Sequence, residues 1–271
     1  ILFTSGSTGL PKGVRISQNN IQAYLEALEA CNYPINYTDR FLNIYDLTFD
    51  ASIQFYVWPI CLGARVYTLP AKGIKYLQAI KTLSQHKITV VKMTPSVLFY
   101  LQKYFDQIQL PLLRFSLFGA EALPESIVEK WQNCVPNAEI HNVYGPTEAT
   151  VNCTCYKWKA NSKHSSFNGI VSIGQPYINT RTIICNSNRQ ILPAGEKGEL
   201  CLAGAQITKG YWKNEDLNKK QFFTKSVNGK TERFYATGDL ATISPNEGNI
   251  FFLGRIDSQV QIDGHRVELG E

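Results

Sequence analysis

EIHNVYGPTE, residues 139–148, is the stretch of sequence that indicates the fold. Residues 139–144 have the pattern of a strand, and a Gly-Pro turn with a threonine and a glutamate follows at once. The same order occurs at 114–121, where a predicted strand leads into Gly119-Ala120-Glu121. Helical patterns alternate with such strands from about 16 to 144, which predicts parallel βαβ units in a doubly wound sheet. Ligands of such sheets bind beyond the carboxyl ends of the strands, where these polar residues lie.

The elements around this stretch support the same interpretation. Ser17 is expected to cap a helix, a second helix is predicted near 73–85, and Pro124 suits the start of a third. Residues 88–91 have the composition of a buried strand. From about 166 the helical period fades, and short β-like runs separated by Gly, Asn and Pro predict a mostly antiparallel region. The fold class is therefore α/β, with a doubly wound, mostly parallel region followed by a β-rich region.

The composition sets the broad class of protein. The chain has 271 residues, 44% of them hydrophobic and 18% charged, enough for a large core. Its lysines are scattered and the net charge is only +5, so we expect no nucleic-acid partner. No apolar run approaches the ~20 residues of a membrane span, and no signal peptide is visible. Seven cysteines without a Cys-x-x-Cys pair suit a reducing compartment, so a cytoplasmic protein without a membrane partner is expected.

The first thirteen residues, ILFTSGSTGLPKG, form a glycine- and hydroxyl-rich loop after an apolar strand end. Glycines let backbone N–H groups converge, hydroxyls add donors, and Lys12 adds a positive charge, so the loop can hold phosphate. It differs from the common P-loop, in which Gly-Lys is followed by Ser or Thr. A flexible surface turn remains the alternative.

Other polar residues complete a candidate nucleotide site. Tyr144 offers an aromatic face for a purine, and Glu148 offers a hard oxygen ligand for Mg²⁺. Asp239 can accept hydrogen bonds from ribose hydroxyls. Taken singly, Tyr144 can equally be a core aromatic and Glu148 a surface acid; taken together, they predict a nucleotide–Mg²⁺ site.

Several motifs together resemble the adenylate-forming superfamily and, within it, the amino-acid adenylation domains of non-ribosomal peptide synthetases. The matching motifs follow the family's order along the whole chain. They are residues 3–13, 49–52, 142–148, 198–200 running to 209–211, 235–240, 254–260 and 264–271.

The resemblance implies ATP-dependent activation of an amino acid to an aminoacyl-adenylate, with release of pyrophosphate. The product is then loaded onto the phosphopantetheine of a peptidyl-carrier domain, expected in the same parent polypeptide. Thr147 and Glu148 take the catalytic roles, on the α-phosphate and on Mg²⁺ respectively. Tyr144 stacks on adenine, and Asp239 with Arg255 holds the ribose. The residues assigned to ATP are Thr4, Ser5, Gly6, Ser7, Thr8, Gly9, Lys12, Gly119, Ala120, Glu121, Asn142, Tyr144, Gly145, Thr147, Asp239 and Arg255.

The resemblance also implies the domain organisation. Residues 1–256 are expected to form the large adenylation core, divided into an α/β part (1–165) and a β-rich, distorted barrel-like part (166–256). Residues 257–271 are the hinge, at Asp257, and the start of a truncated C-terminal lobe. The family's catalytic lysine lies further along that lobe. We therefore expect the chain to be a fragment that adenylates poorly alone, and Lys12 does not take that lysine's place.

The substrate is expected to contact Asp50, whose counterpart in amino-acid-activating relatives pairs with the α-ammonium group. A helix N-cap is the alternative role for this aspartate. Lys92 is the exception in a pocket of mostly small or aliphatic residues, and it favours a polar or acidic side chain such as Glu, Gln, Asp or Asn. Alternatively, Lys92 extends to solvent. The residues assigned to the amino acid are Asp50, Ala51, Gln54, Lys92, Leu117, Gly119, Val143, Val151 and Asn152.

Two other functions remain open. A D-alanine–carrier-protein ligase shares the motifs around 117–124 and 144–150, although Gly119 leaves more room than the thiol side chain such ligases tend to have there. A non-catalytic nucleotide-binding remnant of a larger assembly is the second alternative.

Overall fold

The structure is a computed structural model that describes residues 1–4, 11–160, 162, 166–257, 259–262 and 265–268, the last two ranges as backbone only. The chain forms two compact units, and each is built from separate stretches of sequence. The first unit comprises residues 1–32, 144–155 and 172–271, and the second comprises 33–143 and 156–171. Each unit is described by itself below.

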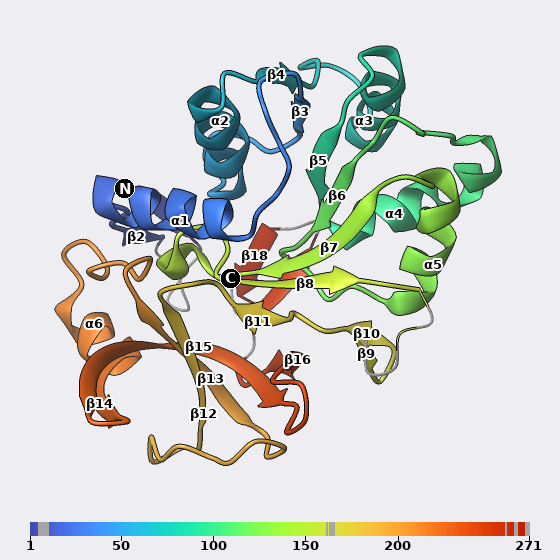
Figure 1. Ribbon diagram of the computed structural model, residues 1–271. Coiled ribbons are helices and arrows are strands. Elements are labelled where there is room, and N and C mark those ends of the chain that lie inside the picture. Colours follow the sequence, from blue (N-terminus) through green and yellow to red (C-terminus); the bar gives the residue numbers. More distant parts are fainter. Residues whose placement is uncertain (5–10, 161, 163–165, 258, 263–264, 269–271) are drawn as a thin grey trace. The chain divides into compact units, whose positions relative to one another are not determined.

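The second unit has a parallel sheet at its centre, with strand order β7-β6-β5-β3-β4 (Figure 1). Helices α2 to α5 connect its strands, so the predicted βαβ alternation is confirmed. Its strands are β3 (Arg40–Asn43), β4 (Arg65–Thr68), β5 (Val90–Met93), β6 (Phe115–Phe118), β7 (Glu139–Tyr144), β9 (Ser166–Phe167) and β10 (Ile170–Val171). Its helices are α2 (Ala51–Cys61), α3 (Lys75–Gln85), α4 (Pro95–Leu101), η1 (Gln102–Gln107) and α5 (Glu125–Cys134).

The core of the second unit lies between this sheet and its helices. β5 and β6 are buried along their whole length, as strands covered on both faces of a parallel sheet are, although they carry the polar residues Lys92 and Ser116. Trp131 of α5 is fully buried, and its indole N–H donates to Ser116 Oγ on β6 at 3.0 Å. Pro124 is the N-cap residue of α5, which confirms the predicted helix start. The buried core fixes β5, β6 and the loops that follow them.

The first unit is mostly antiparallel. Its main sheet has the order β12-β13-β15-β14, with β16 paired to β15 (Figure 1). The predicted β-rich region is therefore confirmed. Its strands are β1 (Leu2–Thr4), β2 (Lys12–Val14), β11 (Gln175–Pro176), β12 (Thr180–Cys185), β13 (Gly198–Gly204), β14 (Phe222–Val227), β15 (Lys230–Ile243), β16 (Ile250–Arg255), β17 (Gln259–Ile262) and β18 (His265–Glu268). Its helices are α1 (Gln18–Ala30), η2 (Thr147–Ala149) and α6 (Glu215–Gln221), and β8 (Thr154–Trp158) begins in this unit and ends in the other.

Helix α1 begins where the sequence predicts. Ser17 Oγ accepts from the Asn20 amide at 3.2 Å, and Asn20 Oδ1 accepts from the Ser17 amide at 3.0 Å. This reciprocal pair is a capping box, with asparagine in place of the usual Glu or Gln. Within the described residues, no helix has the length and apolar character needed to cross a membrane.

Candidate functional site

The predicted phosphate loop is carried by the β1–β2 hairpin of the first unit. Thr4 stands opposite Lys12 at the end of the paired strands. Thr4 Oγ1 is buried and has no hydrogen-bond partner among the described residues. Such an unpaired buried hydroxyl is costly unless a ligand or water completes its bonding. Five of the predicted phosphate-binding residues lie outside the described residues, namely Ser5, Gly6, Ser7, Thr8 and Gly9.

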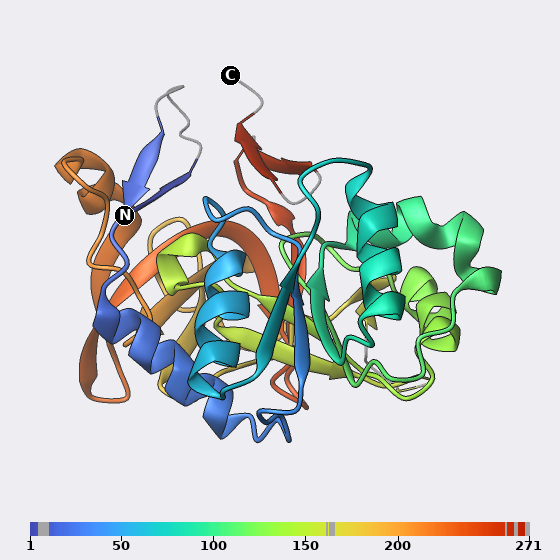
Figure 2. The same cartoon turned by 90° about the horizontal axis from the view of Figure 1, so that it is seen from above.

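The base of this hairpin is held by the segment that leads to α6 (Figure 2). The Trp212 amide donates to Gly13 O at 2.7 Å, and Tyr211 forms an antiparallel bridge with Val14. Arg15 N–H donates to Gly210 O at 3.3 Å. The end of the predicted phosphate loop is thus fixed by a segment about 200 residues further along the chain.

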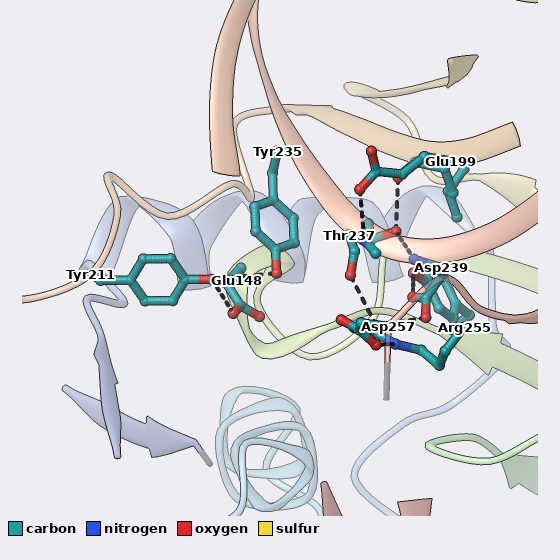
Figure 3. A network of polar contacts seen from close by, with 11 residues as sticks. Glu148, Glu199, Tyr211, Tyr235, Thr237, Asp239, Arg255 and Asp257 are labelled. Carbon is teal, nitrogen blue, oxygen red and sulfur yellow. Dashed lines mark hydrogen bonds and ion pairs between the residues drawn. The ribbon is translucent and has the colours of Figure 1, made fainter. Parts of the chain in front are cut away.

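Glu148, the predicted Mg²⁺ ligand, is completely buried at the start of the first unit's η2 helix. The Tyr211 hydroxyl donates to Glu148 Oε1 at 2.6 Å, and Tyr235 Oη lies 3.4 Å from Tyr211 Oη (Figure 3). The Thr208 amide donates to Glu148 O at 2.8 Å. Burial first, and then the Glu148 carboxylate, raise the pKa of Tyr211 far above its usual range. Tyr211 therefore serves as a hydrogen-bond donor to the carboxylate.

These residues fit a magnesium ion that also binds substrate phosphates. Among the described residues, no group of three or more His, Cys, Asp and Glu side chains gathers as a metal cluster. Mg²⁺ commonly takes one or two protein carboxylates, with phosphate and water oxygens completing its octahedron. A single carboxylate whose orientation is fixed by Tyr211 suits that mode of binding.

Tyr144, Asp239 and Arg255 are brought together in the first unit. The Tyr144 hydroxyl donates to Asp239 Oδ2 at 2.5 Å. Arg255 Nη1 donates to Asp239 Oδ1 at 2.7 Å (Figure 3). Arg255 also donates to the predicted hinge residue, Asp257, from Nε at 2.8 Å and from Nη2 at 2.5 Å. Burial, and then the nearby Asp239 carboxylate, raise the pKa of Tyr144 well above 10.0. One guanidinium thus links the predicted ribose ligand to the predicted hinge.

A tight turn in β15 supports this cluster. Gly238 has φ +75°, which favours glycine, and a Cβ atom there would lie 2.7 Å from Arg255 Nη2, so a larger residue would displace the guanidinium. The Gly238 amide donates to Glu199 Oε1 at 2.9 Å, and Thr237 Oγ1 donates to Leu200 O at 2.8 Å (Figure 3). The Gly238 turn therefore helps to place the Asp239 carboxylate against the Arg255 guanidinium.

The segment after β7 is closely packed. A Cβ atom on Gly145 would lie 2.6 Å from Asn152 Cα and 2.7 Å from Val151 O. Thr150 and Val151 have φ values of 57° and 72°. β-Branched residues are rare in this left-handed region, and here two are consecutive. Asn152 Nδ2 donates to Tyr24 Oη on α1 at 3.0 Å.

The second unit holds seven of the nine predicted contacts to the amino acid, and the other two, Val151 and Asn152, belong to the first unit. Asp50 occupies the N-cap position of α2 but makes no capping hydrogen bond to that helix, all of which is described. The alternative role for Asp50 as a helix cap is thus not supported. Lys92 on β5 is 3% exposed, so it does not extend to solvent, and its Nζ lies 3.5 Å from Gln54 Oε1 on α2. Burial lowers the pKa of Lys92 to about 8, although the negative charge of Asp50 partly opposes this.

Gly119 follows β6 and lies against both Lys92 and Val143. A Cβ atom at this position would lie 2.7 Å from Val143 O and 3.3 Å from Lys92 Cε. Val143 is 1% exposed, as is Leu117 on β6, while Ala51 on α2 is 3% exposed. These residues give Lys92 a largely apolar setting.

The remaining predicted adenine-pocket residues lie just after β6, at Ala120 and Glu121, and within β7, at Asn142. Ala120 has φ 72°, and the Glu121 carboxylate accepts from the Ser96 amide at 2.8 Å. Asn142 Nδ2 donates to Val171 O at 3.2 Å. Thr147 opens η2.

Three residues that hold the predicted site residues in place were not predicted from the sequence. Tyr211 orients Glu148, Glu199 holds the Gly238 turn, and Gln206 binds the segment around Asn152. Tyr211 and Glu199 lie in quoted motifs, but nothing local in the sequence indicates what their side chains contact.

The fold is that of adenylation domains. It superposes on AlmE, an adenylation domain of Vibrio cholerae solved with glycyl-adenosine-5'-phosphate, with a TM-score of 0.88 and 32% identity, covering 99% of this chain and 50% of that one. An artificially fused adenylation–PCP di-domain, NpsA-ThdA from Klebsiella oxytoca, gives a TM-score of 0.84 at 25% identity, covering 98% of this chain and 52% of that one.

The chain belongs to the family of AMP-binding enzymes, whose model matches residues 1–212. It is also 35% identical, over its whole length, to part of tyrocidine synthase 1 of Brevibacillus parabrevis. The chain spans only 24% of that relative. The family predicted from the sequence is therefore confirmed.

Proposed function

We propose that this chain is the amino-acid-adenylating part of a non-ribosomal peptide synthetase. Its relatives' names and the glycyl-adenylate bound by AlmE support this role. The observation that carries it is the carboxylate of Asp50, which stands at the start of α2, makes no capping hydrogen bond to that helix and acts electrostatically on the buried Lys92. A carboxylate in this place can pair with the α-ammonium group of an amino acid.

In the proposed reaction, the amino acid's carboxylate attacks the α-phosphorus of ATP, and the bond to the leaving pyrophosphate breaks. A carboxylate is already ionised at neutral pH, so no general base is required. The protein's contribution is positioning and neutralisation of phosphate charge. Lys12 and Thr4 hold the pyrophosphate side, and Tyr144, Asp239 and Arg255 hold the nucleoside.

Glu148 is proposed to hold Mg²⁺, which supplies charge neutralisation to the phosphates when bound. Thr147 contacts the α-phosphate. The product is passed to phosphopantetheine on a peptidyl-carrier domain, as in the adenylation–PCP arrangement of the Klebsiella protein. We place the protein in the cytoplasm, and we assign the hinge to Asp257, between a core of 1–256 and a C-terminal lobe that begins at 257–271.

The substrate is proposed to be an amino acid whose side chain ends in a carboxylate or an amide. Lys92 is the buried cation of the pocket, and Gln54 beside it offers an amide. An acidic or amide group can accept from Lys92 and offset the cost of burying its charge. An apolar side chain offers no acceptor to this cation.

Amino-acid-dependent pyrophosphate exchange on the full-length parent, across a panel of amino acids, tests both statements. Asp50→Ala is expected to abolish exchange, whereas Asp46→Ala, an exposed aspartate four residues earlier, leaves it intact. Retained exchange in Asp50→Ala refutes the assignment of Asp50. Preference for a bulky apolar amino acid refutes the polar pocket, but not the adenylation itself.

A further inference from the structure

The segment Ala149 to Asn152 in the first unit has an unusual backbone. Thr150 and Val151 are both in the left-handed region, and the four residues are at most 3% exposed. Strained backbone of this kind persists only where the surroundings determine it. Val151 and Asn152 are two of the proposed contacts to the amino acid, so whatever holds this segment also holds these two contacts.

Gln206 holds the segment. Its side-chain amide donates to Asn152 O at 2.7 Å and to Ala149 O at 3.2 Å, and Thr150 O lies 3.5 Å away. In return, Thr150 Oγ1 donates to the main-chain oxygen of Gln206 at 2.6 Å. Gln206 is 2% exposed, so water does not compete for these bonds.

Gln206 is itself held by α1, and the contacts form a closed ring. Asn20 Nδ2 donates to the carbonyls on both sides of Gln206, Ala205 O at 2.8 Å and Ile207 O at 3.2 Å. The ring closes where Asn152 Nδ2 donates to Tyr24 Oη, one turn along α1 from Asn20. Gln206 bonds directly to this segment at Ala149 and Asn152, so a change at Gln206 acts on the backbone that carries Val151 and Asn152.

We propose that Gln206 is a positioning residue that sets the amino-acid selectivity of the enzyme by fixing the backbone of Val151 and Asn152. The proposal rests on the proposed function, because it takes these two residues as contacts to the amino acid. Gln206 acts through them, since its amide nitrogen donates to the main-chain oxygens of Asn152 and Ala149, on either side of Val151. The side chains of the predicted ATP contacts Tyr144, Asp239 and Arg255 bond to one another, so nucleotide binding is expected to change little.

The test uses two variants of the full-length parent protein. Gln206→Met keeps the size of the side chain but removes its N–H donors, and Gln206→Glu replaces these donors by a carboxylate oxygen that faces the carbonyls. Thr180→Val is the matched control, because Thr180 Oγ1 donates to Gln206 Oε1, at 3.4 Å, and not to the amide nitrogen that holds the segment. The first readout is the ratio of kcat/KM for the preferred amino acid to that for the next best, with the KM for ATP measured alongside.

In Gln206→Met we expect this ratio to fall at least about tenfold, the equivalent of about 1.4 kcal/mol, and the KM for ATP to stay within about twofold. Gln206→Glu is expected to lower the ratio further. Thr180→Val is expected to leave it unchanged. An unchanged ratio in both Gln206 variants, with a uniform loss of kcat or of thermal midpoint, overturns the proposal and leaves Gln206 a merely structural residue.

Hydrogen exchange of the parent provides a second readout that needs no activity. Faster amide exchange confined to a peptide covering 148–153 is expected in the Gln206 variants and not in Thr180→Val. Unchanged exchange there overturns the positioning role even if the variants lose activity. If the wild type shows no amino-acid-dependent reaction, the proposed function fails, and the exchange result still decides whether Gln206 fixes this segment. If Gln206→Met does not fold, Gln206→Asn, whose shorter side chain moves the donors away, takes its place.

Discussion

Replacing Lys92 by methionine is expected to change how stability depends on pH. Burial holds the pKa of Lys92 at about 8, against 10.5 for an exposed lysine. At pH 7 the folded protein therefore carries a buried charge that costs roughly 3 kcal/mol, at 1.36 kcal/mol per pKa unit. Methionine fills a similar volume without that charge.

The direction of the pH dependence follows from proton binding. Below pH 8 both the folded and the unfolded chain carry the Lys92 proton, and the full cost is present. Between pH 8 and 10.5 the unfolded chain binds more protons than the folded one, so wild-type stability rises with pH. Between pH 7 and pH 10 the cost falls by about 2.5 kcal/mol. Lys92→Met lacks this group, so its stability relative to wild type should fall by the same amount over this range.

Urea unfolding of the 271-residue chain, followed by tryptophan fluorescence at pH 7 and pH 10, measures this difference. Other groups that titrate in this range are common to both proteins, so their effects cancel in the comparison. Lys81→Met, at an exposed position of α3, is the control and should show no such change. A difference between Lys92→Met and wild type that is the same at both pH values, within about 0.5 kcal/mol, refutes the reasoning.

Three further predictions concern the first unit. Tyr211→Phe removes the donor to buried Glu148 and should lower the free energy of unfolding by about 1.5–3 kcal/mol; an unchanged urea midpoint contradicts this. Arg255→Lys loses the forked contacts to Asp239 and Asp257, so calorimetry should show ATP binding weakened several-fold, and unaltered affinity argues against a ribose role. Gly145→Ala places a Cβ atom 2.6 Å from Asn152 Cα and should lower the thermal midpoint markedly, because the clash is with the backbone and not with a side chain that can rotate away. A midpoint equal to that of the wild type shows that the turn can relax.

The sequence predicts the α/β region well because its signals are local. A strand, a turn and a capped helix are each specified within about a dozen residues, as at Ser17 with α1 and Pro124 with α5. The positions of polar residues after β6 and β7 follow from the same local order. The antiparallel region is also predictable as a class, because Gly, Asn and Pro punctuate its strands.

Contacts between distant side chains leave no such local signal. Tyr211 forms a hydrogen bond with Glu148, 63 residues away in the sequence, and Gln206 forms one with Asn152, 54 residues away. Lys92 is a different case: its sequence context suits either a buried pocket residue or one that extends to solvent, and only the packing around β5 decides between them. Asp50 is similar, since an N-cap position does not by itself show whether the carboxylate caps the helix.

The division of the first unit among three stretches of sequence has a consequence for synthesis on the ribosome. Arg15, just before α1, bonds to Gly210, 195 residues later. At about 5–20 residues per second, roughly 10–40 s pass between translation of the two. During that time α1 has emerged while Ala205 and Ile207, whose carbonyls bond to its buried Asn20, have not yet been made, so this side of the helix stays uncovered on the nascent chain.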